Sequence, residues 1–178
     1  METIRIAHLY YDLMNYYGEQ GNITALTHAI KYANFKVSVD TLSVDDKIDF
    51  NKYDIFYIGT GSPLNQEIVR KDILKYKNDI KNVIDKKMFI ATGNSYELFG
   101  KSIDDKECLG MFNFSSKTHD RIVGEQVFKT NIINQPIIGF QNRSSINDIK
   151  ENYLFEVIKG GEYINPDTFY NMKIEELS

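Results

Sequence analysis

At 178 residues, with 42% hydrophobic and 26% charged residues, the chain predicts one globular domain over residues 1–178 and excludes disorder, collagen and a disulfide miniprotein. The net charge of −4, with no basic stripe, argues against nucleic-acid binding, and a single cysteine excludes an internal disulfide and a cysteine-based zinc site. Because no leader-like segment and no run of about 18 apolar residues occurs, we expect a cytoplasmic protein with no membrane span. We also expect no bound metal and no cofactor.

The N-terminal half of the sequence alternates strand patterns with helix patterns. We expect a helix beginning near Asn22 as its N-cap, a second helix over residues 66–84, and a short helix over residues 96–99 after a sharp break. Such alternation predicts a parallel sheet that is covered by helices on both faces. The expected strands are residues 3–10, 35–39, 54–59 and 88–91.

The pattern changes after residue 100, where no helix of comparable strength is expected. Residues 121–128 and 136–140 have strand patterns, and residues 153–158 form a weaker candidate strand. The tail, residues 173–178, is expected to fray.

Two loops rich in glycine and small polar residues follow the last two strands of the N-terminal half. They are Gly59–Pro63 and Thr92–Ser95. Ligands of open α/β sheets bind beyond the carboxyl ends of the strands, and such loops can present backbone N–H groups to an anion or oxyanion. Spacing alone favours the alternative that both loops are ordinary tight turns between a strand and a helix.

Two stretches of the sequence resemble a known family. Leu9–Ile23 is similar to the motif L-Y-P-D-L-x-N-x-Y-G-D-x-G-N, and Ile90–Gly100 is similar to a nucleophile elbow that reads approximately L-A-I-C-G-G-Y-Q-L-L-G. Both motifs belong to class I glutamine amidotransferases of the GatD type, the glutaminase subunit of lipid II isoglutaminyl synthase, which are related to the cobyric acid synthase amidotransferase domain. Shorter matches lie at residues 54–61, 108–112, 121–124 and 139–142, so the resemblance covers roughly residues 3–145.

The resemblance implies a fold and a chemistry. The fold is a three-layer α/β/α domain with a mostly parallel central sheet, here shortened at its C-terminal side. In this family a thiolate on the elbow attacks the side-chain amide of glutamine, a thioester forms, and ammonia passes to a Mur-ligase-like partner. A histidine further along accepts the thiol proton, and backbone amides stabilise the oxyanion.

The catalytic residues of the family have no counterpart at the matching positions. The nucleophilic cysteine falls on Gly93, so no catalytic residue is assigned, and Cys108 is interpreted as a small core residue. The family's histidine motif has no match in this chain. We expect a structural role for the first of the three histidines, a helix-surface position for the second and a polar loop around the third: His8, His28 and His119.

Binding residues of the family are better retained. Gly59, Thr60 and Gly61 match the loop that offers oxyanion and glutamine contacts. Arg121 matches an arginine near the substrate pocket, with a surface salt bridge as an equally weighted alternative. The candidate substrate-binding residues are therefore Gly59, Thr60, Gly61, Asn94, Arg121 and Asn142.

Three functions remain open. The favoured one is a degenerate amidotransferase-like protein without glutaminase activity that binds glutamine or a related small molecule, a Mur-ligase-like subunit, or a second copy of itself. The second is an active glutaminase that supplies ammonia for peptidoglycan precursor amidation, or a cobyric-acid-synthase-type amidotransferase. The third is a different enzyme on the same scaffold that uses Ser95 or Glu97. Four tyrosines cluster in the first matched stretch: Tyr10, Tyr11, Tyr16 and Tyr17. Two roles are open for them, as anchors of an interface or as residues of the domain's own core.

Overall fold

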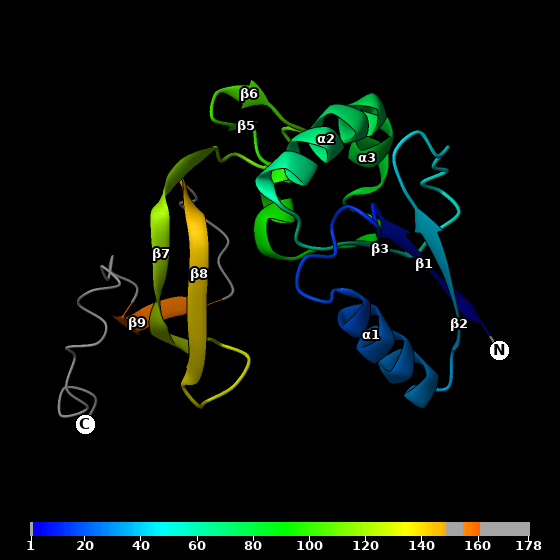
Figure 1. Ribbon diagram of the computed structural model, residues 1–178. Helices are drawn as coiled ribbons and strands as arrows, with labels where there is room; N and C mark the ends of the chain where they lie inside the picture. The colour runs from blue at the N-terminus through cyan, green and yellow to red at the C-terminus, as the bar shows by residue number, and fades with distance from the viewer. Residues whose placement is uncertain (1, 149–154, 161–178) are drawn as a thin grey trace. The chain divides into compact units, whose positions relative to one another are not determined.

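The computed structural model describes residues 2–148 and 155–160 (Figure 1). These residues form two compact units that meet in sequence between Ser115 and Ser116. The first unit contains all the helices of the described chain, and the second is built from strands.

A four-stranded parallel sheet forms the centre of the first unit. Its strands lie in the order β2-β1-β3-β4, so the chain crosses over between neighbours, as parallel strands require. This confirms the parallel sheet predicted from the sequence, with strand ends shifted by a few residues except in the last strand. The strands are β1 (Thr3–Leu9), β2 (Lys36–Leu42), β3 (Ile55–Ile58) and β4 (Met88–Ala91).

Helices cover both faces of this sheet. Alternate side chains of β3 point to opposite faces, and all of them are buried, so each face packs against other elements. Ile55 and Tyr57 pack with Ile23 of helix α1 (Gln20–Tyr32) in one hydrophobic cluster. Phe56 and Ile58 belong to a larger cluster with apolar residues of α2 (Pro63–Ile73) and α3 (Lys77–Val83). The three layers expected from the sequence are therefore present in this unit.

The helix boundaries differ from those predicted. Helix α1 begins two residues before Asn22, with Glu19 at its N-cap, because the Asn22 side chain bonds Glu19 and Tyr57 instead of capping the helix. The expected helix over residues 66–84 begins at Pro63, after a cap by the Ser62 side chain, and is interrupted by a tighter 3₁₀ turn, η1 (Leu74–Tyr76). A 3₁₀ turn keeps nearly the same apolar spacing, so periodicity does not reveal it.

Two short elements complete the first unit after β4. The 3₁₀ helix η2 (Gly93–Phe99) follows the sheet, and it begins three residues earlier than predicted. A small hairpin of β5 (Ser102–Ile103) and β6 (Lys106–Glu107) comes next.

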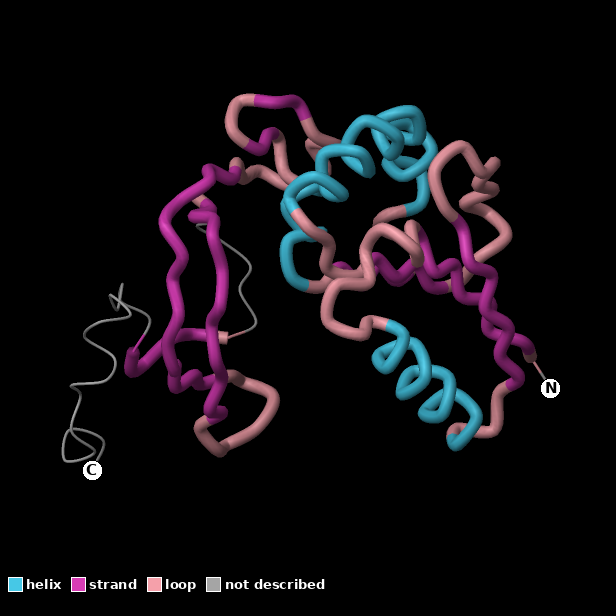
Figure 2. Tube along the Cα trace, in the orientation of Figure 1, coloured by secondary structure: helices cyan, strands magenta, loops and turns pink. Residues whose placement is uncertain are grey.

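The second unit consists of strands (Figure 2). Strand β7 (Ser116–Lys129) pairs antiparallel with both β8 (Ile137–Asn147) and β9 (Glu156–Gly160). Strands β7 and β8 are longer than predicted because their polar ends pair through the backbone. His119 therefore lies in strand β7, not in a polar loop. The predicted tail and the first part of the expected strand over residues 153–158 lie outside the described residues.

Candidate functional site

The loop after β4 makes the sharp turn expected of a nucleophile elbow. Gly93 follows the strand with a φ of +55° and starts helix η2 directly. This left-handed conformation is costly for most residues and costs glycine almost nothing. The elbow geometry is thus present, but the residue at its tip carries no side chain that could act as a nucleophile.

The side chain of Thr60 lies where a side chain on Gly93 would project. A Cβ atom added at Gly93 would overlap with Oγ1 of Thr60 and lie 2.8 Å from Cγ2 and 2.9 Å from Cβ of that residue. Gly93 itself is exposed, so the obstruction concerns the direction of its Cβ rather than the whole residue.

Asn94 engages the backbone of the first glycine-rich loop. Its Oδ1 accepts a hydrogen bond from the Gly61 N–H at 3.0 Å, and its Nδ2 donates to the Gly61 carbonyl oxygen, also at 3.0 Å. The two candidate loops therefore lie side by side. The Gly61 amide, predicted to serve an oxyanion or a glutamine ligand, is already bonded within the protein.

The buried carboxylate of Glu19 forms hydrogen bonds with both of these loops. Its Oε1 accepts the Thr60 N–H at 3.0 Å, and its Oε2 accepts the Thr92 hydroxyl at 2.9 Å and the Asn22 amide at 2.8 Å. The Tyr57 hydroxyl also donates to Oε2. Only 5% of Glu19 is exposed. Residue-by-residue reasoning did not select Glu19, although it occupies the acidic position of the matched N-terminal motif.

The environment of Glu19 sets its charge. Burial favours the neutral acid, but hydrogen bonds from Tyr57, Thr60 and Thr92 outweigh it and hold the pKa of Glu19 below its ordinary value. Burial and the adjacent carboxylate together raise the pKa of Tyr57. At neutral pH this pair is therefore a carboxylate and a phenol, which suits it to fixing loops rather than to exchanging protons.

Close packing against the N-terminal segment explains the first glycine of the loop. A Cβ at Gly59 would overlap with the Met14 carbonyl oxygen and the Glu19 side chain. Gly59 therefore permits the segment after β1 to approach the end of β3.

His8 is buried at the carboxyl end of β1 and packs edge-on against Tyr57, with ring centroids 5.4 Å apart. Within residues 2–148 and 155–160, neither ring nitrogen has a hydrogen-bond partner. Burial lowers the pKa of His8, and the nearby Glu19 carboxylate opposes this only in part. His28, as predicted, is on the exposed surface of α1.

The residues considered for other chemistry are buried. Ser95 is fully buried, and its hydroxyl lies 2.8 Å from the Thr92 carbonyl oxygen. Glu97 accepts a hydrogen bond from Gln66 at 2.8 Å. Cys108 is also buried, and burial raises the pKa of its thiol to about 11, which confirms its interpretation as a core residue.

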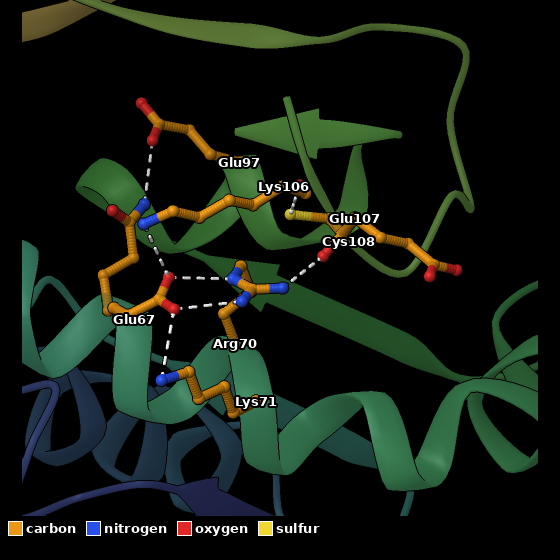
Figure 3. A network of polar contacts seen from close by, with 8 residues as sticks. Glu67, Arg70, Lys71, Glu97, Lys106, Glu107 and Cys108 are labelled. Atoms are coloured by element: carbon orange, nitrogen blue, oxygen red, sulfur yellow. Dashed lines mark hydrogen bonds and ion pairs between the residues drawn. The ribbon is translucent and has the colours of Figure 1, made fainter. Parts of the chain in front are cut away.

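A polar network near these residues fastens the β5–β6 hairpin to helix α2 (Figure 3). Arg70 donates to both carboxylate oxygens of Glu67, at 2.9 and 3.0 Å, and to the Glu107 carbonyl oxygen at 2.6 Å. Hydrogen bonds from Arg70 lower the pKa of Glu67 to about 2. In the part of the chain that is described, no three His, Cys, Asp or Glu side chains gather as metal ligands would.

The remaining candidate residues belong to the second unit. Arg121 donates from Nε to Oδ1 of Asn142 at 2.8 Å, and both residues are exposed. The structure thus brings Gly59, Thr60, Gly61 and Asn94 together in the first unit, and it pairs Arg121 with Asn142 in the second.

The four clustered tyrosines divide into one core residue and three surface residues. Tyr10 is buried and donates its hydroxyl to Asp72 at 2.9 Å, so it is not available as an interface anchor. Tyr11, Tyr16 and Tyr17 are 40%, 61% and 74% exposed. The rings of Tyr16 and Tyr17 stack with centroids 5.2 Å apart.

No helix in residues 2–148 and 155–160 has the length and hydrophobicity that crossing a bilayer requires.

Comparison with known proteins places the chain in a family. The family of CobB/CobQ-like glutamine amidotransferase domains matches residues 5–173. The chain is 30% identical over 148 residues to the lipid II isoglutaminyl synthase (glutamine-hydrolyzing) subunit GatD of Streptococcus pneumoniae (strain ATCC BAA-255 / R6), covering 78% of this chain and 56% of the relative. It is 33% identical over 150 residues to the same subunit of Staphylococcus aureus (strain N315), covering 80% and 61%. The chain thus spans about three fifths of the length of these relatives, and it belongs to the CobB/CobQ-like glutamine amidotransferase domain family.

Proposed function

We propose that the chain is an amidotransferase-like subunit that acts in peptidoglycan precursor amidation in the cytoplasm without hydrolysing glutamine itself. Gly93 carries this proposal, because it occupies the tip of the elbow, where the matched motif has its nucleophilic cysteine. Covalent hydrolysis of glutamine requires a nucleophile at that point. The family match over residues 5–173 supports treating both units as parts of one amidotransferase-like domain.

The hydrogen bonds around the elbow support a non-catalytic role. Stabilisation of an oxyanion requires donors that are free to point at the developing charge. Here the N–H groups of Thr60 and Gly61 are directed to Glu19 and Asn94. A role that survives the loss of chemistry is binding to a Mur-ligase-like subunit, and the exposed Tyr16 and Tyr17 supply suitable anchors.

Active glutamine hydrolysis is the second candidate function. The left-handed turn at Gly93 and the relatives' glutamine-hydrolysing activity favour it. It would require a nucleophile from another position, and the buried Ser95 and Cys108 are poorly placed to supply one.

The two candidates are separated by measuring ammonia release from L-glutamine by the purified chain, alone and mixed with the partner subunit of the Staphylococcus aureus synthase. We expect no release above buffer in either sample, and retention of the chain on the immobilised partner subunit. Gly93→Cys should remain inactive as well, since Thr60 occupies the direction of its side chain. Turnover of about 1 s⁻¹, a low but ordinary rate for an enzyme, would refute the proposal.

A further inference from the structure

Residues 60 and 93 face each other across the two candidate loops, and their sizes are reversed relative to the matched motifs. The family motif that residues 54–61 resemble, D-x-x-x-x-G-G-G, has glycine at the position of Thr60, and the elbow motif has cysteine at the position of Gly93. We propose that Thr60 is a plug: its side chain takes the volume of the missing nucleophile, so that a side chain fits at residue 93 only when that of residue 60 is removed. This inference deepens the proposed function and rests on it for the identity of the nucleophile position.

Hydrogen bonds hold the backbone of Thr60 in place, and with it the Cβ atom that lies 2.9 Å from a Cβ added at Gly93. The N–H of Thr60 is bonded to Glu19 at 3.0 Å, and its carbonyl oxygen accepts the Tyr16 N–H at 2.9 Å. The next residue, Gly61, is bonded through both backbone polar groups to Asn94. Two separate segments of the chain, Tyr16–Glu19 and the loop that contains Asn94, therefore fix this one turn.

The same contacts also bear on whether the loop could bind the carboxamide of glutamine. The Asn94 side chain is a primary carboxamide, like the side chain of glutamine, and it uses both the donor and the acceptor of Gly61. With Thr60 beside it, the loop presents neither a free carboxamide-binding pair nor room for a reacting side chain. The elbow is closed by the protein's own groups.

A double-mutant cycle on thermal stability tests the plug. The variants are Gly93→Ala, Thr60→Gly and the two combined. An added Cβ is overpacked when Thr60 is present, so Gly93→Ala alone should lower Tm by roughly 4–8 °C. In the Thr60→Gly background the same change should cost less than about half of that. The penalty of a positive φ is common to both backgrounds and cancels in the cycle.

Two further substitutions serve as matched controls. Thr60→Ser keeps the overlapping Oγ1, and Thr60→Val keeps the branched volume, so neither should rescue Gly93→Ala. If Gly93→Ala alone does not fold, the proposal requires that the combined variant does. Equal Tm losses in the wild-type and Thr60→Gly backgrounds would overturn the plug. Because this readout is stability, that result is distinct from a failure of the proposed function, which is read in ammonia release.

Discussion

Glu19 receives hydrogen bonds from four residues of the first unit: Asn22, Tyr57, Thr60 and Thr92. It therefore joins the start of α1 to the ends of β3 and β4 through one carboxylate. An ionised carboxylate has no O–H donor and accepts strongly at both oxygens, so these bonds favour the charged form, which agrees with the lowered pKa of Glu19. The residue acts on the loops' geometry, and nothing in its surroundings assigns it a chemical step.

Glu19→Gln tests this role. A carboxamide has one acceptor oxygen in place of two, so at least one buried donor loses its partner, and the free energy of unfolding should fall by about 1–3 kcal/mol. Urea denaturation measures the change. The control is Glu125→Gln on the exposed surface of β7, which should alter stability by less than about 0.5 kcal/mol. Equal stability of the two variants would contradict the role given to Glu19.

Because His8 is buried, we expect the protein to lose stability in mild acid. The pKa of His8 in the folded state lies below the ordinary value of 6.5, so the unfolded chain binds more protons. Stability should therefore fall as the pH drops below 6.5, toward the folded-state pKa. Glu19 also has a lowered pKa, but its contribution is lost only below 4.5, as the pH falls through its folded-state value.

The Tm of the wild type and of His8→Leu is measured from pH 7.5 to pH 5, in steps of about half a pH unit. We expect the His8→Leu curve to be the flatter one between pH 6.5 and 5. A wild-type slope that persists unchanged in the variant would assign the acid sensitivity to other groups.

Among the helices and strands, the sequence predicts the bounds that depend on residue spacing. It does not predict the bounds that depend on contacts between distant segments. Met88–Ala91 has the predicted bounds because a short apolar run stops at small polar residues. The start of α1 was misplaced because Asn22, a good capping residue by type, bonds Tyr57 of a strand 35 positions away. The elbow and its neighbouring loop were foreseeable from their motifs. The filling of the elbow by Thr60 was not, because spacing carries no information on which side chain occupies a volume.

Tyr10→Phe tests the join between the first loop and helix α2. The Tyr10 hydroxyl donates to the buried Asp72, and its removal leaves that carboxylate with fewer partners. Lys75 still bonds Asp72 at 2.6 Å, so we expect a loss near the lower end of about 1–3 kcal/mol in the free energy of unfolding. Tyr32, which is 93% exposed, provides the matched control: Tyr32→Phe should leave the unfolding curve unchanged.

Considered as a whole, the molecule keeps the expected fold in its first unit and has glycine at the tip of the elbow. The parallel sheet, the covering helices and the left-handed elbow are all present. The role proposed for the chain is binding to another subunit, and such binding should depend on exposed side chains rather than on the elbow.

Tyr16 and Tyr17 offer the most direct test of such an interaction. Replacing both with Ala should weaken retention on the Mur-ligase-like partner subunit by about tenfold or more, because buried tyrosines at an interface are costly to truncate. Their exposure of 61% and 74% predicts little change in Tm. Retention equal to that of the wild type would exclude this surface as the docking site, and a lower Tm would show that the pair supports the fold instead.

An electrophilic glutamine analogue, such as a diazoketone amino acid, shows whether the chain has a nucleophile for glutamine. Such a reagent forms a stable bond with the nucleophile that would attack the glutamine amide. The purified chain is incubated with the reagent, with and without the partner subunit, and its intact mass is measured. We expect an unchanged mass in both samples. One adduct per chain, blocked by excess L-glutamine and mapped to any residue, would contradict this expectation.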